Sequence, residues 1–214
     1  MKTVPRLILA VPRGIVRRLA LSVSRRSRLA KLDWFRDRIP VGSTVLMVGM
    51  NAEVGAIDNI VETGLDAAVR ACSLIYDPGQ GWTGRTVRGA APRLPFADGS
   101  VDLVISNAVL EHVGGPEAAV VMVAESRRVA RVAAIHTTPY RWYPVETHSK
   151  VPLLHWLPRR LQHRAFSFVG VPWFRPEEYW LFDRRDLTSL GERPMTVHRV
   201  GVSLVAEWPT SRKA

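Results

Sequence analysis

The sequence is poor in cysteine and in lysine. Cys72 is the single cysteine among 214 residues, and thirty basic residues include only four lysines. One cysteine excludes a disulfide framework and a cluster of thiolate metal ligands, and it is compatible with a reducing cytoplasm. No apolar run approaches the ~20 residues that a membrane-spanning helix needs. The arginine bias, together with abundant alanine and valine, is typical of a high-GC bacterial genome. A chain of this length is sufficient for one α/β domain with a small appendage.

Acidic residues are absent from residues 1–32, which carry nine basic side chains. The rest of the chain is nearly neutral, with 21 basic against 19 acidic residues. On a helical wheel Ile15, Val16 and Leu19 share one arc, and Arg17 and Arg18 lie opposite. This basic amphipathic segment, residues 1–40, has two interpretations. It lies on an anionic membrane surface, or it is a helix docked on the domain with solvated arginines. We therefore expect a cytoplasmic protein, with peripheral attachment to the inner face of the membrane as the alternative.

The remaining chain alternates strand and helix patterns. Parallel strands are expected at 44–49, 72–77, 86–88, 101–106 and 132–136, and helices at 56–71 and 116–130. Segments 195–200 and 202–208 flank Gly201 and predict an antiparallel strand pair. The fold class is therefore α/β: a Rossmann-like, doubly wound, mostly parallel sheet that ends in this pair. The domain is expected to span 41–209, with a disordered tail at 210–214.

The most informative motif covers residues 94–113. It reads Leu-Pro-Phe, a turn with Asp98, an apolar strand that stops at Ser106-Asn107, and then Leu-Glu-His ending at His112. Ligands in open α/β sheets bind beyond the carboxyl ends of the strands, so the stretch 107–112 is expected at a site. The motif closely resembles that of class I S-adenosylmethionine-dependent methyltransferases of the type 11 group. The resemblance implies S-adenosylmethionine as cofactor and a binding cleft in place of a catalytic triad.

The glycine-rich turn of that family is altered here. In the segment 47–55 only Gly49 stands at a glycine position of the family pattern, and Asn51 and Glu53 replace the next two. Gly49, Met50 and Asn51 are the expected contacts of the cofactor in this turn, because glycine lets the backbone approach a ligand closely.

Two further cofactor contacts are expected from the resemblance. Asp77 stands where an acid bonds the ribose hydroxyls, although Asp77-Pro-Gly is also good turn chemistry. The loop before Leu94 reads Ala90-Ala91 where the family has an aspartate for the adenine, so that polar contact is lost. The complete set of expected cofactor-binding residues adds to the first turn the residues Asp77, Ala90, Ala91, Leu94, Asn107 and Ala108.

A proline-rich segment at about 137–180 predicts a lid after the fifth strand. Prolines 139, 144, 152 and 158 exclude a long helix, and the aromatic content argues against disorder. The segment resembles the Thr-Pro…Glu-x-His signature of one type 11 subgroup. We expect Tyr140, Trp142 and His112 to contact the acceptor.

Glu146 or His148 is expected to act as a general base, because residues i and i+2 of an extended chain share one face. The alternative is a purely structural lid in which both side chains bond backbone groups. His136, at a strand end, is a further candidate for the base. No metal site is expected.

The resulting prediction is a methyltransferase that acts on a small-molecule or lipid-linked acceptor. One alternative is a catalytically inactive binding or scaffold protein, which the altered glycine turn favours. A nucleic-acid methyltransferase is disfavoured, because the body of the chain is neutral. The expected partners are the acceptor and, through residues 1–32, an anionic membrane.

Overall fold

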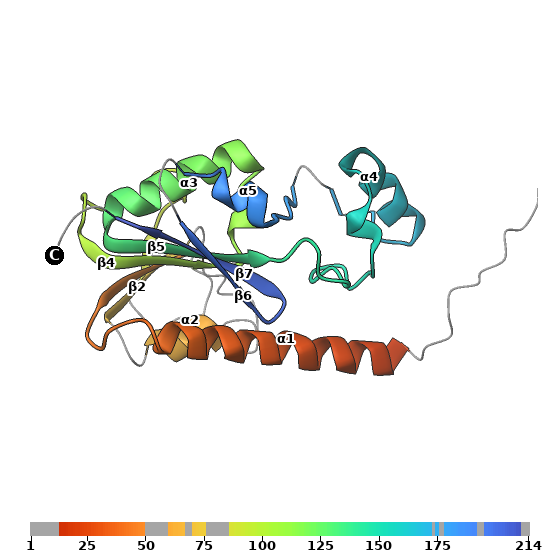
Figure 1. Ribbon diagram of the computed structural model, residues 1–214, viewed down its shortest axis with the longest axis horizontal. Coiled ribbons are helices and arrows are strands. Elements are labelled where there is room, and N and C mark those ends of the chain that lie inside the picture. The colour runs from red at the N-terminus through yellow and green to blue at the C-terminus, as the bar shows by residue number, and fades with distance from the viewer. Residues whose placement is uncertain are drawn as a thin grey trace, which may run out of the picture.

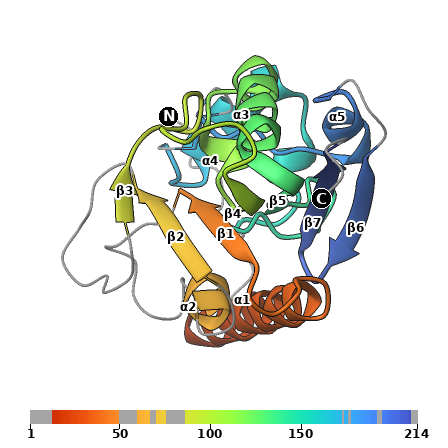
Figure 2. The same cartoon turned by 90° about the vertical axis from the view of Figure 1, so that its left-hand side faces the viewer.

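The computed structural model describes residues 13–49, 60–66, 70–75, 86–172, 174–175, 178–191 and 195–210. A seven-stranded sheet runs through it (Figure 1), and its strand order is β3-β2-β1-β4-β5-β7-β6 (Figure 2). Pairs from β3 to β5 are parallel, and β5, β7 and β6 pair antiparallel. The strands are β1 (Thr44–Val48), β2 (Arg70–Ile75), β3 (Thr86–Arg88), β4 (Val101–Asn107), β5 (Ala130–Pro139), β6 (Thr196–Val200) and β7 (Ser203–Pro209). This order and its final antiparallel pair confirm the predicted fold class.

Helices cover both faces of the sheet. Figure 2 shows α1 and α2 below it and α3 with α5 above it, and Figure 1 shows α4 apart from these layers in the lid. The helices are α1 (Arg13–Arg36), α2 (Ile60–Asp66), α3 (Pro116–Val129), α4 (Arg159–Phe168) and α5 (Arg184–Thr188), with the 3-10 turns η1 (Leu110–His112) and η2 (Leu154–Trp156). Helix α3 begins at Pro116, whose fixed φ suits the first helical turn.

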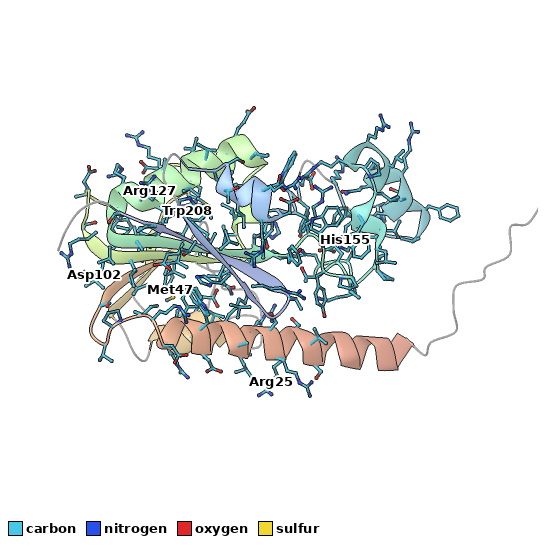
Figure 3. All side chains as sticks on the ribbon, viewed as in Figure 1. Arg25, Met47, Asp102, Arg127, His155 and Trp208 are labelled. Carbon is cyan, nitrogen blue, oxygen red and sulfur yellow. The ribbon has the colours of Figure 1, made fainter. Side chains whose placement is uncertain are left out.

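Two clusters of buried side chains hold these layers together. The cluster under α3 and α5 includes Val104, Met122 and Trp208, and the cluster toward α1 and α2 includes Phe35 and Met47. Figure 3 shows Trp208 and Met47 on opposite sides of the sheet. Neighbouring residues of one strand point to opposite faces, so a strand covered on both faces must be apolar throughout. That requirement explains the apolar runs at 45–48 in β1 and 103–105 in β4.

Helix α1 is docked on the domain along its C-terminal half. Leu32 and Phe35 are buried, and Gly64 of α2 allows close approach, because a Cβ there would lie 2.4 Å from the Leu32 side chain. The docked interpretation therefore holds for this half. The side chains of 13–21 lie outside the described set, so their contact with a membrane stays a prediction. Within the described residues, no helix has the length and apolar character to cross a membrane.

The lid differs from the expected extended segment. After a proline-rich stretch it forms α4, which packs through Phe166 against Phe174 in a small cluster of its own. Strand β5 also runs three residues beyond His136, because Thr137 to Pro139 pair with β7. The disordered tail expected at 210–214 begins too early by one residue. Thr210, directly after β7, still bonds the sheet, because its amide donates to the Val132 carbonyl at 2.9 Å.

Candidate active site

A cavity of about 900 Å³ opens where the carboxyl ends of β1 and β4 meet the lid. Its volume is at the upper end of the ~300–1,000 Å³ usual for small-ligand pockets. Parts of the chain that are distant in sequence form its wall: α1, Glu62 of α2, the ends of β1 and β4, the lid, and the β6–β7 hairpin. The lining includes Arg28, Lys31, Gly49, Glu62, Asn107, Ala108, Val109, His112, Tyr143, Glu146, His148 and Tyr179.

Gly49 directly follows β1 and lies at the wall of this cavity. Its φ is +82°, and a Cβ at this position would lie 2.5 Å from a methyl carbon of Val109. Both conditions require glycine, since L residues rarely adopt this φ and no space exists for a side chain. Met50, Asn51 and Asp77, the other expected contacts on this side, lie outside the described residues.

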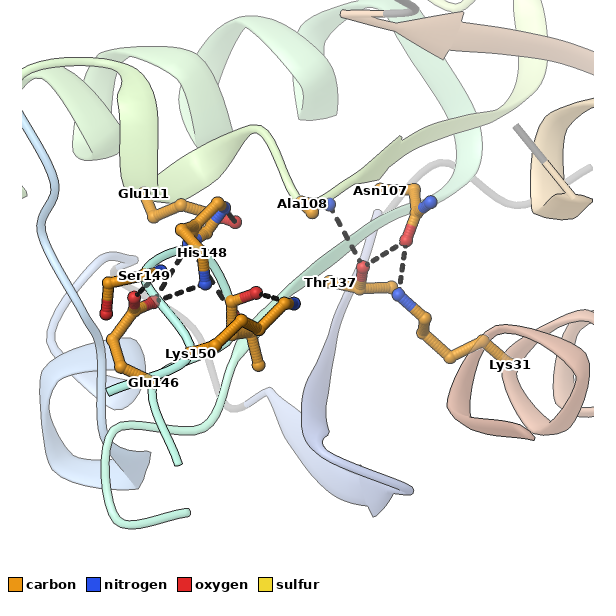
Figure 4. Close-up of polar contacts among 10 residues, drawn as sticks. Lys31, Asn107, Ala108, Glu111, Thr137, Glu146, His148, Ser149 and Lys150 are labelled. Atoms are coloured by element: carbon orange, nitrogen blue, oxygen red, sulfur yellow. Dashed lines mark hydrogen bonds and ion pairs between the residues drawn. The ribbon is translucent and has the colours of Figure 1, made fainter. Parts of the chain in front are cut away.

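Asn107, the last residue of β4, is the centre of a hydrogen-bonded group beside Gly49. Its Oδ1 accepts hydrogen bonds from Lys31 Nζ at 2.6 Å and from Thr137 Oγ1 at 2.9 Å (Figure 4). Its Nδ2 donates to Glu62 Oε1 at 3.0 Å. The Ala108 amide donates to Thr137 Oγ1 at 3.2 Å. These bonds fix the direction in which the chain leaves the sheet at the expected cofactor position.

Lys31 and Glu62 are both buried, and their ionisation is shifted accordingly. Burial lowers the pKa of Lys31 to about 8, although Glu62 and Glu111 oppose this shift. Burial also raises the pKa of Glu62, although its bond with Asn107 favours the charged form. Sequence reasoning missed both residues, because no local pattern relates positions 31 and 62 to position 107.

Glu146 and His148 form a bonded pair on the lid side. Residues 147–149 make a turn, and Glu146 Oε1 accepts bonds from the backbone amide of His148 at 2.9 Å and from its Nδ1 at 3.0 Å. The Ser149 amide donates to Glu146 Oε2. The expected extended geometry is therefore wrong at this point: a turn closed by the Glu146 carboxylate brings the two residues together.

The charges of this pair stabilise each other. Burial opposes ionisation of Glu146, but hydrogen bonds from His148 and Ser149 overcome it and lower the pKa to about 2. Burial likewise opposes protonation of His148, but Glu146 and Glu111 prevail and raise its pKa. Each partner thus favours the charged form of the other, a carboxylate at Glu146 and an imidazolium at His148. Neither group accepts a proton readily in that state, so their role as general base stays a prediction.

Glu111 and His112, from η1, face the same turn. Glu111 is completely buried, and its Oε1 lies 3.9 Å from His148 Nε2. Burial raises the pKa of Glu111, with His148 opposing. The rings of His112, His148 and Tyr179 contact one another edge to face, with centroids 4.6–5.2 Å apart. Glu111 and Tyr179 were not foreseen as site residues, although Glu111 belongs to the Leu-Glu-His motif.

Three expected acceptor or base residues lie away from the cavity. His136 is fully buried, with Nδ1 2.7 Å from Ser106 Oγ and its ring against Trp208, and burial lowers its pKa to about 3. We therefore drop His136 as a base. Tyr140 packs on the core, and Trp142 is on the surface beside Trp156. Tyr143 lines the cavity in their place.

Of the expected cofactor contacts, Gly49, Asn107 and Ala108 line the cavity. Leu94 is buried in the core under α3, and Ala90 and Ala91 lie in the loop before it, outside the cavity lining.

Solved structures with this architecture come from several organisms. A Thermotoga maritima S-adenosylmethionine-dependent methyltransferase, described as a possible histamine N-methyltransferase, aligns with a TM-score of 0.58, 15% identity and coverage of 92% of this chain and 96% of that one. An S-adenosylmethionine-dependent methyltransferase from Aquifex aeolicus aligns with a TM-score of 0.51 and 13% identity, and the alignment covers 91% of this chain and 96% of that one. Magnesium protoporphyrin IX methyltransferase from Synechocystis, with bound S-adenosylmethionine, aligns with a TM-score of 0.53 and 14% identity, and the alignment covers 96% of this chain and 88% of that one. At these identities the likeness shows the fold.

The fold and the cavity thus define a Rossmann-like domain with a ligand site at the carboxyl rim of its sheet. Residues 46–135 match the family model for a methyltransferase domain, type 11. Over this stretch the chain carries the sequence pattern of that family, as its resemblance to class I S-adenosylmethionine-dependent methyltransferases predicts. The match confirms the predicted family and class of enzyme, and with it the cofactor of that class. No curated protein matches the chain in sequence.

Proposed function

We propose that this protein transfers the methyl group of S-adenosylmethionine to an acceptor bound beneath the lid. One observation supports this most strongly: a single cavity joins the expected donor residues Gly49, Asn107 and Ala108 to the lid pair Glu146 and His148. Methyl transfer from a sulfonium needs the donor and the nucleophile held in line, and such positioning can lower the barrier by ~7–11 kcal/mol. A shared, partly enclosed cavity meets that requirement.

The lid contributes an acceptor side of mixed polarity. Tyr143, Glu146, His148 and Tyr179 line it, and the carboxylate of Glu146 holds the imidazolium of His148 toward Glu111. A fixed cation of this kind can orient an electron-rich acceptor atom and stabilise charge that develops on it.

The outer surface of the lid favours a lipid-linked acceptor over a freely soluble one. Residues 147–176 contain five basic residues and no acidic one. Exposed apolar side chains lie among them, on and beside α4: Leu153, Trp156, Leu157, Leu161, Phe168 and Val169. Leu161, Arg164 and Phe168 are three to seven residues apart, so they share one face of α4. A surface that combines arginine with exposed aromatic and aliphatic groups suits an anionic lipid interface.

Calorimetric titration with S-adenosylmethionine and with its demethylated product tests the donor site. We expect micromolar binding by the wild type and at least tenfold weaker binding by Gly49→Ala, because the new methyl group displaces Val109 in the cavity wall. Absence of binding up to millimolar concentrations in the wild type would instead favour the inactive scaffold protein.

Vesicle sedimentation tests the lipid surface. We expect the protein to bind phosphatidylglycerol vesicles and not phosphatidylcholine vesicles, and Phe168→Asp to weaken that binding. Val41→Asp is the matched control, because Val41 is 95% exposed and Phe168 87%, but Val41 precedes β1 at the opposite end of the sheet. Equal partitioning of the two variants contradicts docking through the lid.

A further inference from the structure

Three side chains with metal-ligating atoms meet at the lid side of the cavity. Glu111 and His112 come from the 3-10 turn after β4, and His148 comes from the turn that Glu146 closes (Figure 4 shows Glu111, Glu146 and His148). One carboxylate oxygen and two imidazole nitrogens lie within 4.8 Å of one another. They thus converge on one point from two segments that are far apart in the sequence.

Glu111 is the unusual member of this group. Its side chain is completely buried, and among the described residues neither carboxylate oxygen has a hydrogen-bond partner. Burial of a carboxylate without partners is costly, and buried charges are as a rule paired or coordinate a metal ion. His148 Nε2, 3.9 Å from Oε1, is within ion-pair range but too far for a hydrogen bond, so neither oxygen has a direct polar contact among the described residues.

The distance between Glu111 and His148 fits a shared ion. The 3.9 Å between Glu111 Oε1 and His148 Nε2 is too long for a hydrogen bond. Two ligands bound ~2.1 Å from the same ion lie about 3.4 Å apart in a tetrahedral site and about 4.2 Å apart when opposite each other. The observed separation falls between these values.

The second nitrogen of His148 has the partner expected for a metal ligand. Nδ1 is 3.0 Å from Glu146 Oε1, and the backbone amides of His148 and Ser149 hold that carboxylate in place. Metal-bound histidines commonly donate their other ring N–H to a carboxylate, which fixes the tautomer and the ring orientation. With Nδ1 bonded in this way, Nε2 is directed toward Glu111.

We propose that Glu111, His112 and His148 bind one divalent transition-metal ion in the cavity. Two imidazoles and one carboxylate suit Zn²⁺, Mn²⁺ or Fe²⁺ better than Mg²⁺ or Ca²⁺, which prefer all-oxygen sites. His148 coordinates through Nε2 as the neutral imidazole, so the ion takes the place of a proton there. Three protein ligands leave at least one position open toward the cavity. An oxygen of the acceptor can occupy that position, a role that rests on the proposed function and that would favour loss of the acceptor's proton.

Metal binding is measured on the full-length protein after removal of any affinity tag and treatment with a chelator. Equilibrium dialysis against Zn²⁺, Mn²⁺ and Mg²⁺, followed by elemental analysis, should give one Zn²⁺ or Mn²⁺ per chain and much weaker binding of Mg²⁺. Glu111→Gln and His148→Asn should each reduce the affinity at least a hundredfold. His163→Asn is the matched control and should bind as the wild type does, because His163 is exposed on α4 and bonds the Phe174 carbonyl.

Glu146→Gln tests the supporting carboxylate without removing a ligand. Loss of such a partner typically weakens metal binding by about 10–100-fold. Glu111→Gln also serves as a folding control, because it replaces a buried unpaired carboxylate by a neutral group of the same shape. The metal-free variant should melt at or above the wild-type temperature. Metal at one hundred times Kd should raise the wild-type melting temperature by roughly 5–10 °C and leave this variant unchanged.

The proposal is overturned if the wild type binds no Zn²⁺ or Mn²⁺ at about 0.1 mM, a concentration at which even a weak metal site would be occupied. It is also overturned if Glu111→Gln and His148→Asn bind as tightly as the wild type. Titration with S-adenosylmethionine on the same samples separates the two ideas. Donor binding without metal binding contradicts only the metal site, and metal binding without donor binding contradicts only the proposed methyl transfer.

Discussion

Replacement of Gly49 by alanine should destabilise the protein for two separable reasons. The φ of +82° is unfavourable for an L residue, and the Cβ would lie 2.5 Å from one methyl carbon and 2.8 Å from the other methyl carbon of Val109. The left-handed conformation costs about 1–2 kcal/mol, and overpacking of this kind typically costs about 1–3 kcal/mol. Valine cannot rotate away freely, because its branched Cβ restricts χ1. We therefore expect a loss of about 2–5 kcal/mol of unfolding free energy.

Gly42 provides the matched control for this substitution. Its φ is +84°, nearly that of Gly49, but no atom lies within 4 Å of a Cβ built there. Gly42→Ala therefore carries only the conformational cost. The difference between the two variants isolates the steric term of about 1–3 kcal/mol. In a Val109→Ala background that difference should largely disappear, since the obstructing methyl groups are gone.

Urea unfolding of the wild type, the three single variants and the two double variants, analysed by linear extrapolation, gives the required free energies. The reasoning is refuted if Gly49→Ala and Gly42→Ala destabilise equally, within about 0.5 kcal/mol, a typical limit for additivity of independent sites. It is also refuted if Val109→Ala leaves the effect of Gly49→Ala unchanged, because the clash would then not involve Val109.

Three further outcomes follow from the buried groups. The folded state holds the pKa of Glu146 at about 2, against 4.5 in the unfolded chain, so this group stabilises the fold above pH 4.5. As the pH falls toward 2, the free energy of unfolding should decrease by roughly 3 kcal/mol. Glu146→Gln should lack this pH-dependent decrease in acid unfolding. The lowered pKa of Lys31, about 8 against 10.5, means that the wild type gains stability between pH 8 and pH 10.5; Lys31→Met should show no such gain, and equal slopes for both proteins would contradict this. Phe166→Ala should cost about 3–5 kcal/mol in the lid cluster and speed hydrogen exchange of lid amides, while uniform acceleration across β1 and β4 would show that the lid is not a separate unit.

The order of strands and helices could be predicted from the sequence because its signals are local. A mostly apolar run such as 101–105, ended by the polar pair Ser106-Asn107, specifies a buried strand whatever lies elsewhere in the chain. The same reasoning placed Gly49, Asn107 and Ala108 at the carboxyl rim, because parallel strands share one such edge. The bounds were less certain, as β5 shows, since its extension to Pro139 depends on pairing with β7.

The lid illustrates what periodicity cannot decide. Alternation in an extended chain would place Glu146 and His148 on one face, and both do line the cavity. They meet through a turn that backbone amides and the Glu146 carboxylate stabilise, and that turn depends on the specific hydrogen bonds of this chain. Periodicity also does not predict which aromatic residue of the lid reaches the cavity: Tyr143 faces it, whereas Tyr140 packs on the core.

The sequence by itself determined the fold class, the family motif and the position of the rim, because each rests on residues that are close together along the chain. Only the tertiary structure decided that Lys31 and Glu62 meet at Asn107, that Glu111 faces His148, and that His136 is enclosed beside Trp208. These contacts join residues 37 to 76 positions apart in the sequence. No local pattern encodes them, because they arise from the packing of α1, the sheet and the lid around one cavity.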